Sequence, residues 1–251
     1  MQIISVINQK GGVGKTTTVI NLAAGLSQSN KKILVIDLDP QGNATTGLGL
    51  SNMDSSSDTI YGVLNGTKEI SDVIKSTQFD NLDIITSNVD LSGLEVETAD
   101  DSNRAFILKS KLTAYLNNSR GSYDYVLIDC PPSLSLLTVM ALVSSNSLLV
   151  PLQTEFFALE GLTQLMKTIE RIKVNLNPGL QIRGILLTMY DKRNKLSSQV
   201  EKEARDYFTE KVYSTVIPRN VRLSEAPSHG MPVLIYDKSC PGSKSYFSFT
   251  D

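Results

Sequence analysis

The stretch IISVINQKGGVGKTT, residues 3–17, decides the fold class of this 251-residue chain. Residues 3–7 are apolar except for one serine. They predict a buried β-strand, because strands covered on both faces of a sheet are apolar on consecutive residues. A glycine-rich turn follows, and residues 15–29 have the pattern of a helix. A strand, a glycine-rich turn and a helix in this order predict a cradle for phosphate groups.

The turn is a variant of the usual phosphate loop. The usual motif G-x-x-x-x-G-K-[ST] requires a glycine at position 9, where this chain has glutamine. The variant motif K-G-G-x-G-K-T-[TS] fits at every position. Backbone N–H groups can surround a phosphate, Lys15 can reach the β- and γ-phosphates, and the Thr16 hydroxyl can ligate Mg²⁺. A turn that only caps a helix is the alternative, and it leaves the Lys-Thr-Thr sequence unexplained. The predicted nucleotide-binding residues here are Lys10, Gly11, Gly12, Val13, Gly14, Lys15, Thr16 and Thr17.

Outward from this loop, apolar runs alternate with helical patterns. Strands are expected at 3–7, 33–36, 82–85, 125–128, 147–151, 182–187 and 212–216, and helices at 15–29, 104–115, 134–142, 158–175 and 199–208. Residues 51–58 (SNMDSSSD) are expected to form a polar surface loop. The alternation predicts an α/β fold with a single doubly wound, mostly parallel sheet flanked by helices, in one domain over residues 1–251. Such sheets bind ligands at the carboxyl ends of their strands.

Carboxylates follow two of the expected strands at that edge. Asp37 and Asp39 lie on the same side of the chain after 33–36, and Asp129 ends 125–128 in the manner of a Walker B segment. Phosphoryl transfer needs acids that hold Mg²⁺-bound water and orient the attacking water. Asp129 is therefore expected to bind the metal through water. Asp37 and Asp39 could instead cap the following Pro-Gln-Gly turn, a role that suits Asp37 better than Asp39.

Composition excludes several classes of protein. No run of about 18 apolar residues exists, so no transmembrane helix is expected, and the first residues lack the basic start of a signal peptide. Two cysteines and one histidine cannot form a disulfide framework or a four-ligand zinc site, and they suit a reducing cytoplasm. The charge balance is −6 over residues 1–100, +1 over 101–180 and +3 over 181–251. This bias is weak support for a polyanionic partner, and ordinary solvated helix faces explain it equally well.

A second lysine in the loop and three later segments carry a family resemblance. Lys10 lies at the strand end, where it is poorly placed to fold back on its own loop. The later segments are FFALEG at 156–161, LTMYDKR at 187–193 and VIPRNVRLSEAPS at 216–228. With the phosphate loop they resemble the ParA/Soj chromosome and plasmid partitioning ATPases, in the ParA/MinD group with a deviant Walker A motif. The resemblance runs from residue 9 to residue 242.

The resemblance implies a reaction and its residues. The protein would hydrolyse ATP slowly to ADP and phosphate with Mg²⁺. Lys10 would reach the nucleotide of a second subunit in an ATP-bound sandwich homodimer, and Asp39 would position or activate water. The implied catalytic residues are Lys10, Lys15 and Asp39, and the implied nucleoside-pocket residues are Pro218, Arg219 and Asn220.

The resemblance also implies partners. The dimer would bind DNA without sequence preference, on the nucleoid in the cytoplasm, and a ParB/Spo0J-like protein with a basic N-terminal segment would stimulate hydrolysis. The best matches for DNA contacts are Lys192, Arg193, Lys195 and Arg222. Arg193 is expected to be exposed and free, because no acid follows it before Glu201.

Three alternatives remain at this stage. A ParA-like ATPase could position a cargo other than DNA, because the partner selects the cargo. A MinD-like membrane-site ATPase would end in a basic amphipathic helix, and here residues 242–246 are followed by only five residues, so the last helix is expected to be barely begun and the chain cut short. An iron–sulfur relative would need two cysteines in a matching context, and Cys130 instead reads as a small buried residue.

Overall fold

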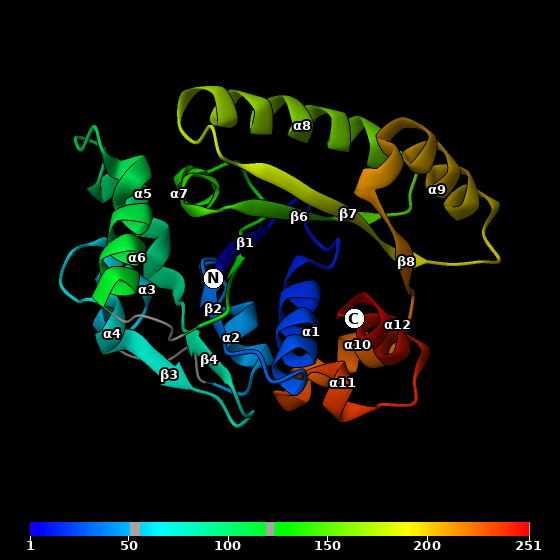
Figure 1. The fold of residues 1–251 in the computed structure, drawn as a ribbon, viewed down its shortest axis with the longest axis horizontal. Coiled ribbons are helices and arrows are strands. Elements are labelled where there is room, and N and C mark those ends of the chain that lie inside the picture. The colour runs from blue at the N-terminus through cyan, green and yellow to red at the C-terminus, as the bar shows by residue number, and fades with distance from the viewer. Residues whose placement is uncertain (51–55, 119–122, 251) are drawn as a thin grey trace.

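The computed structural model describes residues 1–50, 56–118 and 123–250, and within them eight strands form one sheet (Figure 1). The order across the sheet is β3-β4-β2-β5-β1-β6-β7-β8. All neighbouring strands are parallel except β3, which runs antiparallel to β4. The bounds are β1 Gln2–Val6, β2 Ile33–Asp37, β3 Ile74–Ser76, β4 Leu82–Ile85, β5 Tyr125–Asp129, β6 Ser147–Gln153, β7 Gln181–Tyr190 and β8 Val212–Pro218. The predicted mostly parallel α/β sheet is confirmed.

The centre of the sheet is fully buried, which explains its apolar strands. Every residue of β2 is buried, as are all but the first residues of β1 and β5. β1 pairs with β5 on one side and with β6 on the other, so the strand order changes direction at β1. A crevice forms outside the carboxyl ends of the strands at such a switch point. The phosphate loop follows β1 directly and therefore enters this crevice.

Helices cover both faces of the sheet (Figure 1). One face carries α1 and α12, with the short helices α2, α10 and α11 beside them, and the other carries α6, α7, α8 and α9. The helices are α1 Lys15–Gln28, α2 Asn43–Gly47, α3 Ile60–Leu64, α4 Ile70–Val73, α5 Leu94–Glu97, α6 Ile107–Asn118, α7 Leu136–Ser144, α8 Ala158–Asn175, α9 Lys195–Phe208, α10 Val221–Glu225, α11 Val233–Tyr236 and α12 Pro241–Thr250. None of the described helices is both long and apolar enough to cross a bilayer.

The end of the chain differs from the expectation. Residues 241–250, expected to hold only the start of a helix, form the ten-residue helix α12. Tyr246 anchors it: the ring is fully buried, and its hydroxyl lies 3.0 Å from Oγ1 of Thr18 in α1. One buried aromatic side chain thus ties the last helix to the helix of the phosphate loop. Residues 51–55 of the expected polar loop lie outside the described residues.

Candidate nucleotide site

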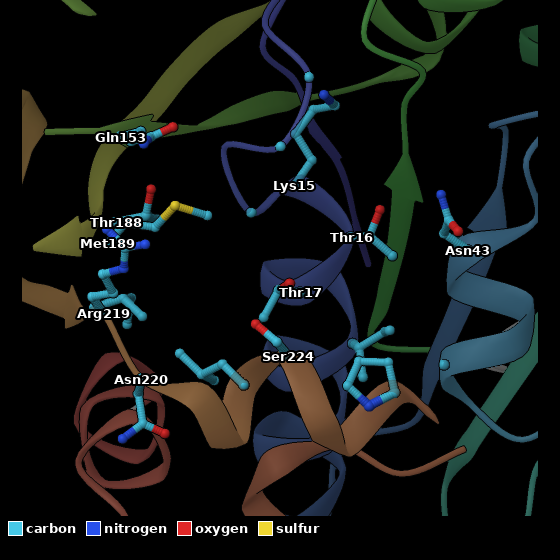
Figure 2. A pocket seen from close by; sticks show the side chains of 18 of the residues that line it. Lys15, Thr16, Thr17, Asn43, Gln153, Thr188, Met189, Arg219, Asn220 and Ser224 are labelled. Atoms are coloured by element: carbon cyan, nitrogen blue, oxygen red, sulfur yellow. The ribbon is translucent and has the colours of Figure 1, made fainter. Parts of the chain in front are cut away.

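A cleft of about 730 Å³ opens at the carboxyl ends of the central strands (Figure 2). Lys15, Thr16 and Thr17 project into it from the start of α1. Figure 2 shows Asn43 on one side of these residues and Gln153, Thr188, Met189 and Arg219 on the other. The cleft therefore runs from the phosphate loop toward the ends of β7 and β8, and it has room for a nucleotide.

The phosphate loop is built on two glycines in left-handed backbone conformations. Gly12 has φ 73° and Gly14 has φ 89°, values that residues with a side chain rarely adopt. This backbone curls around the lysine of its own helix, and Lys15 Nζ donates a hydrogen bond to the carbonyl oxygen of Lys10 at 3.1 Å. Burial lowers the pKa of Lys15, and the nearby Asp129 carboxylate opposes that shift. Lys15 is thus held at the position where a phosphate chain would enter.

Thr16 and Asp129 form a pair that suits Mg²⁺. Thr16 Oγ1 donates to Asp129 Oδ2 at 2.7 Å, whereas Asp129 Oδ1 is buried and has no hydrogen-bond partner among the described residues. Burial raises the pKa of Asp129 well above its ordinary value, and the charge of Asp37 adds to the effect. A divalent cation there would use this free oxygen, directly or through water, and would neutralise charge on the phosphate oxygens. The donor set therefore fits Mg²⁺.

The two acids after β2 have different surroundings. Asp37 is fully buried, and its Oδ2 accepts hydrogen bonds from the amide and the hydroxyl of Thr45, both at 2.8 Å. Burial raises the pKa of Asp37 to about 6. Asp39 borders the cleft, and its Oδ1 accepts a hydrogen bond from the amide of Gln41 at 3.0 Å. Asp37 therefore holds the turn after β2, and Asp39 is the one of these two acids that lines the cleft.

The expected nucleoside loop also lines the cleft. Pro218 ends β8, Arg219 and Asn220 follow it, and all three line the cleft. The amide of Arg219 donates to the carbonyl oxygen of Tyr190 at 3.0 Å, which ties the loop to the end of β7. Asn220 Oδ1 accepts from the amide of Arg222 at 3.0 Å and caps α10.

Two residues of the phosphate loop are placed differently from the others. The Val13 side chain is buried and does not line the cleft, so its expected role in binding is limited to the backbone. Its carbonyl oxygen accepts a hydrogen bond from Thr188 Oγ1 at 2.8 Å. Lys10 does not line the cleft either, and its half-exposed side chain forms an ion pair with Glu155. The expectation that Lys10 points away from its own phosphates agrees with this geometry.

Several cleft residues were missed by the sequence analysis. They include Asn43, Thr46, Gln153, Thr188, Met189 and Ser224. Gln153 ends β6, and Thr188 and Met189 lie at the end of β7. The rule that ligands bind at the carboxyl ends of parallel strands could have identified these three. Asn43 and Thr46 belong to a five-residue helix whose sequence carries no strong signal.

The four expected DNA-contact residues are all exposed, and they fall into two groups. Lys192 and Arg193 lie in the turn between β7 and α9, at a second cleft of about 710 Å³ that Arg219 also lines. Lys195 and Arg222 do not line this cleft. The expectation that Arg193 is free was wrong. Its Nη2 lies 2.9 Å from Oδ2 of Asp191, an acid two residues before it, because the tight turn folds the guanidinium back.

Arg222 is also paired. Its Nη1 lies 2.6 Å from Glu225 Oε2, one helical turn further along α10, and its Nε lies 3.5 Å from Asp237 Oδ2. Both arginines are thus exposed but engaged by carboxylates. Surface pairs of this kind are weak and exchange readily for other partners. The arginines stay accessible to a polyanion that can displace the acids.

Comparison with known sequences identifies the family. Residues 1–182 match the AAA domain family. The chain is 52% identical over 246 residues to the chromosome partitioning protein ParA of Caulobacter vibrioides, covering 98% of this chain and 91% of that protein. It is 49% identical over 245 residues to the sporulation initiation inhibitor protein Soj of Bacillus subtilis, covering 98% and 95%.

Solved structures agree with the fold, and the two that follow contain a nucleotide and magnesium. A cobyrinic acid a,c-diamide synthase from Mycobacterium smegmatis with a bound ATP analogue and magnesium matches with a TM-score of 0.85 at 33% identity, covering 100% of this chain and 93% of that one. The septum site-determining protein MinD of Pyrococcus horikoshii, in complex with Mg-ADP, matches with a TM-score of 0.80 at 28% identity, covering 99% and 94%. The phosphate loop, the acids at the strand ends and these relatives lead to one conclusion: the chain belongs to the ParA/Soj family of partitioning ATPases and uses ATP and Mg²⁺.

Proposed function

We propose that Mg-ATP drives this chain into a sandwich homodimer, that the dimer binds DNA without sequence preference, and that hydrolysis of ATP releases the DNA. The observation that carries the proposal is the placement of Lys10. It belongs to the phosphate loop, yet its half-exposed side chain lies outside the cleft against Glu155. A lysine of the phosphate loop whose side chain lies outside the cleft of its own chain can contact the nucleotide that a second copy binds.

The loop geometry supports this division of labour between the two lysines. Lys15 is buried and donates a hydrogen bond to the carbonyl oxygen of Lys10, whereas the Lys10 side chain pairs with Glu155 and does not line the cleft. Gly11 and Gly12 are exposed, so two such loops can approach closely. A bound triphosphate adds a high negative charge, which a cation from the partner would offset. ATP would then hold the dimer together, and loss of the γ-phosphate would release it.

We assign to Asp39 the role of positioning the water molecule that attacks the γ-phosphate. Asp39 borders the cleft two residues beyond Asp37, and one of its oxygens is held by the amide of Gln41. An acid held this way can orient a water molecule without contributing much to nucleotide affinity. Thr16 and Asp129 hold the metal side of the site. Removing Asp39 should therefore stop turnover and spare assembly.

DNA binding is assigned to the exposed basic residues near the ends of β7 and β8. Lys192, Arg193, Lys195 and Arg222 would contact phosphates, so binding would depend steeply on salt and not on sequence. The overall charge of the chain is −2, so the basic patch must be local. A dimer presents the patch twice and gains affinity through two linked contacts. The dimer would then reside on the nucleoid, and a ParB/Spo0J-like partner would stimulate hydrolysis during chromosome or plasmid segregation.

DNA binding compared in three nucleotide states tests the proposal. Fluorescence anisotropy with two unrelated duplexes would follow the wild-type protein with Mg-ADP, the wild-type protein with Mg-ATP, and Asp39→Ala with Mg-ATP. We expect no binding with ADP, transient binding with ATP, and persistent binding of both duplexes by Asp39→Ala. A Lys15→Ala control should not respond to nucleotide. Equal DNA binding with ADP and ATP would contradict the proposal, as would a preference for one duplex.

A further inference from the structure

The end of β7 is irregular where it borders the nucleotide cleft. Residues 187–190 of β7 lie opposite residues 216–218 of β8, so β7 has one extra residue here. Such a β-bulge bends its strand, and bulges are frequent beside functional sites. Met189 lies in the bulge with φ 51°, a left-handed conformation that is strained for a residue with a side chain. A strained strand end therefore forms part of the cleft wall.

The neighbours of Met189 are bonded to both loops of the nucleotide cleft. Thr188 is buried, and its Oγ1 donates a hydrogen bond to the carbonyl oxygen of Val13 in the phosphate loop at 2.8 Å. The carbonyl oxygen of Tyr190 accepts a hydrogen bond from the amide of Arg219 in the nucleoside loop at 3.0 Å. The strained residue thus lies between one contact to the phosphate loop and one contact to the nucleoside loop.

The next three residues, 191–193, form a segment that we call the DNA turn, because it contains two of the expected DNA contacts. Asp191 Oδ1 accepts a hydrogen bond from the amide of Arg193 at 3.0 Å, and its Oδ2 accepts one from Arg193 Nη2 at 2.9 Å. Thr188 is fixed to the phosphate loop, so a change of φ at Met189 would redirect the chain that follows. Such a change would move Asp191 together with the guanidinium that it holds.

We propose that Met189 is a positioning residue that sets the DNA turn according to the occupant of the nucleotide cleft. Its side chain is 36% exposed and lines the cleft, so a bound nucleotide would meet it. Figure 2 shows Thr188, Met189 and Arg219 together on one wall of the cleft. A ligand that interacts differently with two backbone arrangements shifts the balance between them. This inference rests on the proposed function, and it adds that nucleotide acts on the DNA turn within one chain, before a second copy binds.

The residue type at position 189 supports a role beyond ending the strand. Glycine adopts a positive φ without strain, and it is the usual residue for this conformation in a bulge. Methionine is strained there, but it adds a flexible and polarizable side chain that adapts to the shape of its neighbours. Met189 therefore combines a contact surface for the nucleotide with a backbone conformation that is ready to change.

The test separates the DNA turn from dimer assembly by using Lys10→Ala, which should bind nucleotide and stay monomeric. Two-dimensional NMR follows the Nε–H signal of Arg193, which is assigned by its loss in Arg193→Lys. We expect this signal to move by more than its line width when saturating Mg-ATP is added. The Nε–H signal of Arg171, at an exposed position of α8, should stay in place and serves as the internal control.

Two further substitutions in the Lys10→Ala background should abolish the movement of the Arg193 signal. Met189→Gly removes the side chain that meets the nucleotide and frees the backbone. Thr188→Val removes the hydrogen bond to the phosphate loop and keeps the size of the side chain. Calorimetry on the same samples confirms that nucleotide is bound. Ile235→Gly, at the same 36% exposure in α11, is the matched control and should leave the movement intact.

A second measurement uses the dimer. In the Asp39→Ala background, Met189→Gly should dimerise with Mg-ATP like its parent but bind DNA at least about twofold more weakly, the lower end of the effects of residues that couple two sites. If the Arg193 signal does not move in Lys10→Ala, or moves equally in Met189→Gly and Thr188→Val, the inference is overturned and the proposed function stands. If the Asp39→Ala parent forms no DNA-binding dimer with Mg-ATP, the proposed function is overturned, and the DNA role of the turn with it. An equal loss of movement in Ile235→Gly would overturn the assignment to Met189.

Discussion

Replacing Arg193 with alanine should weaken DNA binding for all sequences and flatten its dependence on salt. The side chain is 90% exposed and lies in the turn after β7, away from the phosphate loop. Each phosphate contact contributes about 0.9 to the slope of log affinity against log salt, so two copies in a dimer contribute about 1.8. If the two proteins bind equally at about 1 M salt, this slope difference means an affinity loss of about 60-fold at 0.1 M.

Asp191 should oppose the same contact. Its carboxylate receives hydrogen bonds from Arg193 Nε at 3.1 Å and Nη2 at 2.9 Å. These bonds lower the pKa of Asp191 to about 2, so the acid is ionised at any ordinary assay pH and competes with DNA phosphate. Asp191→Asn should therefore raise DNA affinity. It should raise affinity more in the wild-type protein than in Arg193→Ala, because the second protein has no guanidinium to release.

The assay is fluorescence anisotropy of two unrelated duplexes over a salt range of about 0.05 to 0.2 M, with Mg-ATP and the Asp39→Ala background. Arg171→Ala, at an exposed position of α8, is the control for loss of one positive charge. A slope unchanged by Arg193→Ala would refute the reasoning. It would also fail if the variant lost DNA binding only because it no longer dimerised, which light scattering on the same samples would reveal.

Four further predictions concern the nucleotide site. Lys15→Ala should lose nucleotide binding, whereas Lys10→Ala should still bind one nucleotide per chain; calorimetry that finds both deficient would place Lys10 at its own phosphates. Asp39→Ala should keep the affinity of the wild-type protein for ATP, and a large loss of affinity would make Asp39 a structural or metal residue. Thr16→Val should weaken Mg²⁺ binding by at least about tenfold in a Mg²⁺ titration of nucleotide affinity, because it removes the hydroxyl beside Asp129; an unchanged titration would remove Thr16 from the metal site. The fourth concerns Asp37, whose pKa of about 6 exceeds its ordinary 3.8, so that its favourable contribution to the nucleotide-free fold is complete below about pH 4 and is lost as pH rises through 6. Between about pH 4 and pH 6, the melting temperature of Asp37→Asn should therefore fall less than that of the wild-type protein. Equal changes of melting temperature with pH in the two proteins would contradict this.

The central strands and the phosphate loop were predictable because local signals decide them. β1, β2 and β5 are apolar on consecutive residues, and a strand buried on both faces tolerates little else. The glycines at 12 and 14 are required by backbone conformations with positive φ. Asp39 and Asp129 come at or just after the carboxyl ends of parallel strands, so the sequence alone predicts that they lie at one edge of the sheet.

The remaining features depend on contacts between distant residues. The antiparallel edge strand β3 has three residues and exists through its pairing with β4. Helix α12 has few apolar residues, and it is held by contacts with distant elements: Tyr246 reaches α1, and Phe249 packs edge to face against Tyr213 of β8. The pairing of Arg193 with Asp191 depends on the turn after β7, in which Asp191 accepts hydrogen bonds from both the amide and the guanidinium of Arg193. An acid two residues before it closes the turn, and sequence distance in one direction does not reveal such a contact.

The mass of the protein in solution tests the central claim most directly. The monomer has a mass of 27.4 kDa. We predict that light scattering gives this mass for the wild-type protein with Mg-ADP and about twice this mass for Asp39→Ala with Mg-ATP. Lys10→Ala combined with Asp39→Ala should return to the monomer mass with Mg-ATP. If Asp39→Ala remains at 27.4 kDa with saturating Mg-ATP, or if the double variant dimerises equally well, then ATP does not join two copies through Lys10.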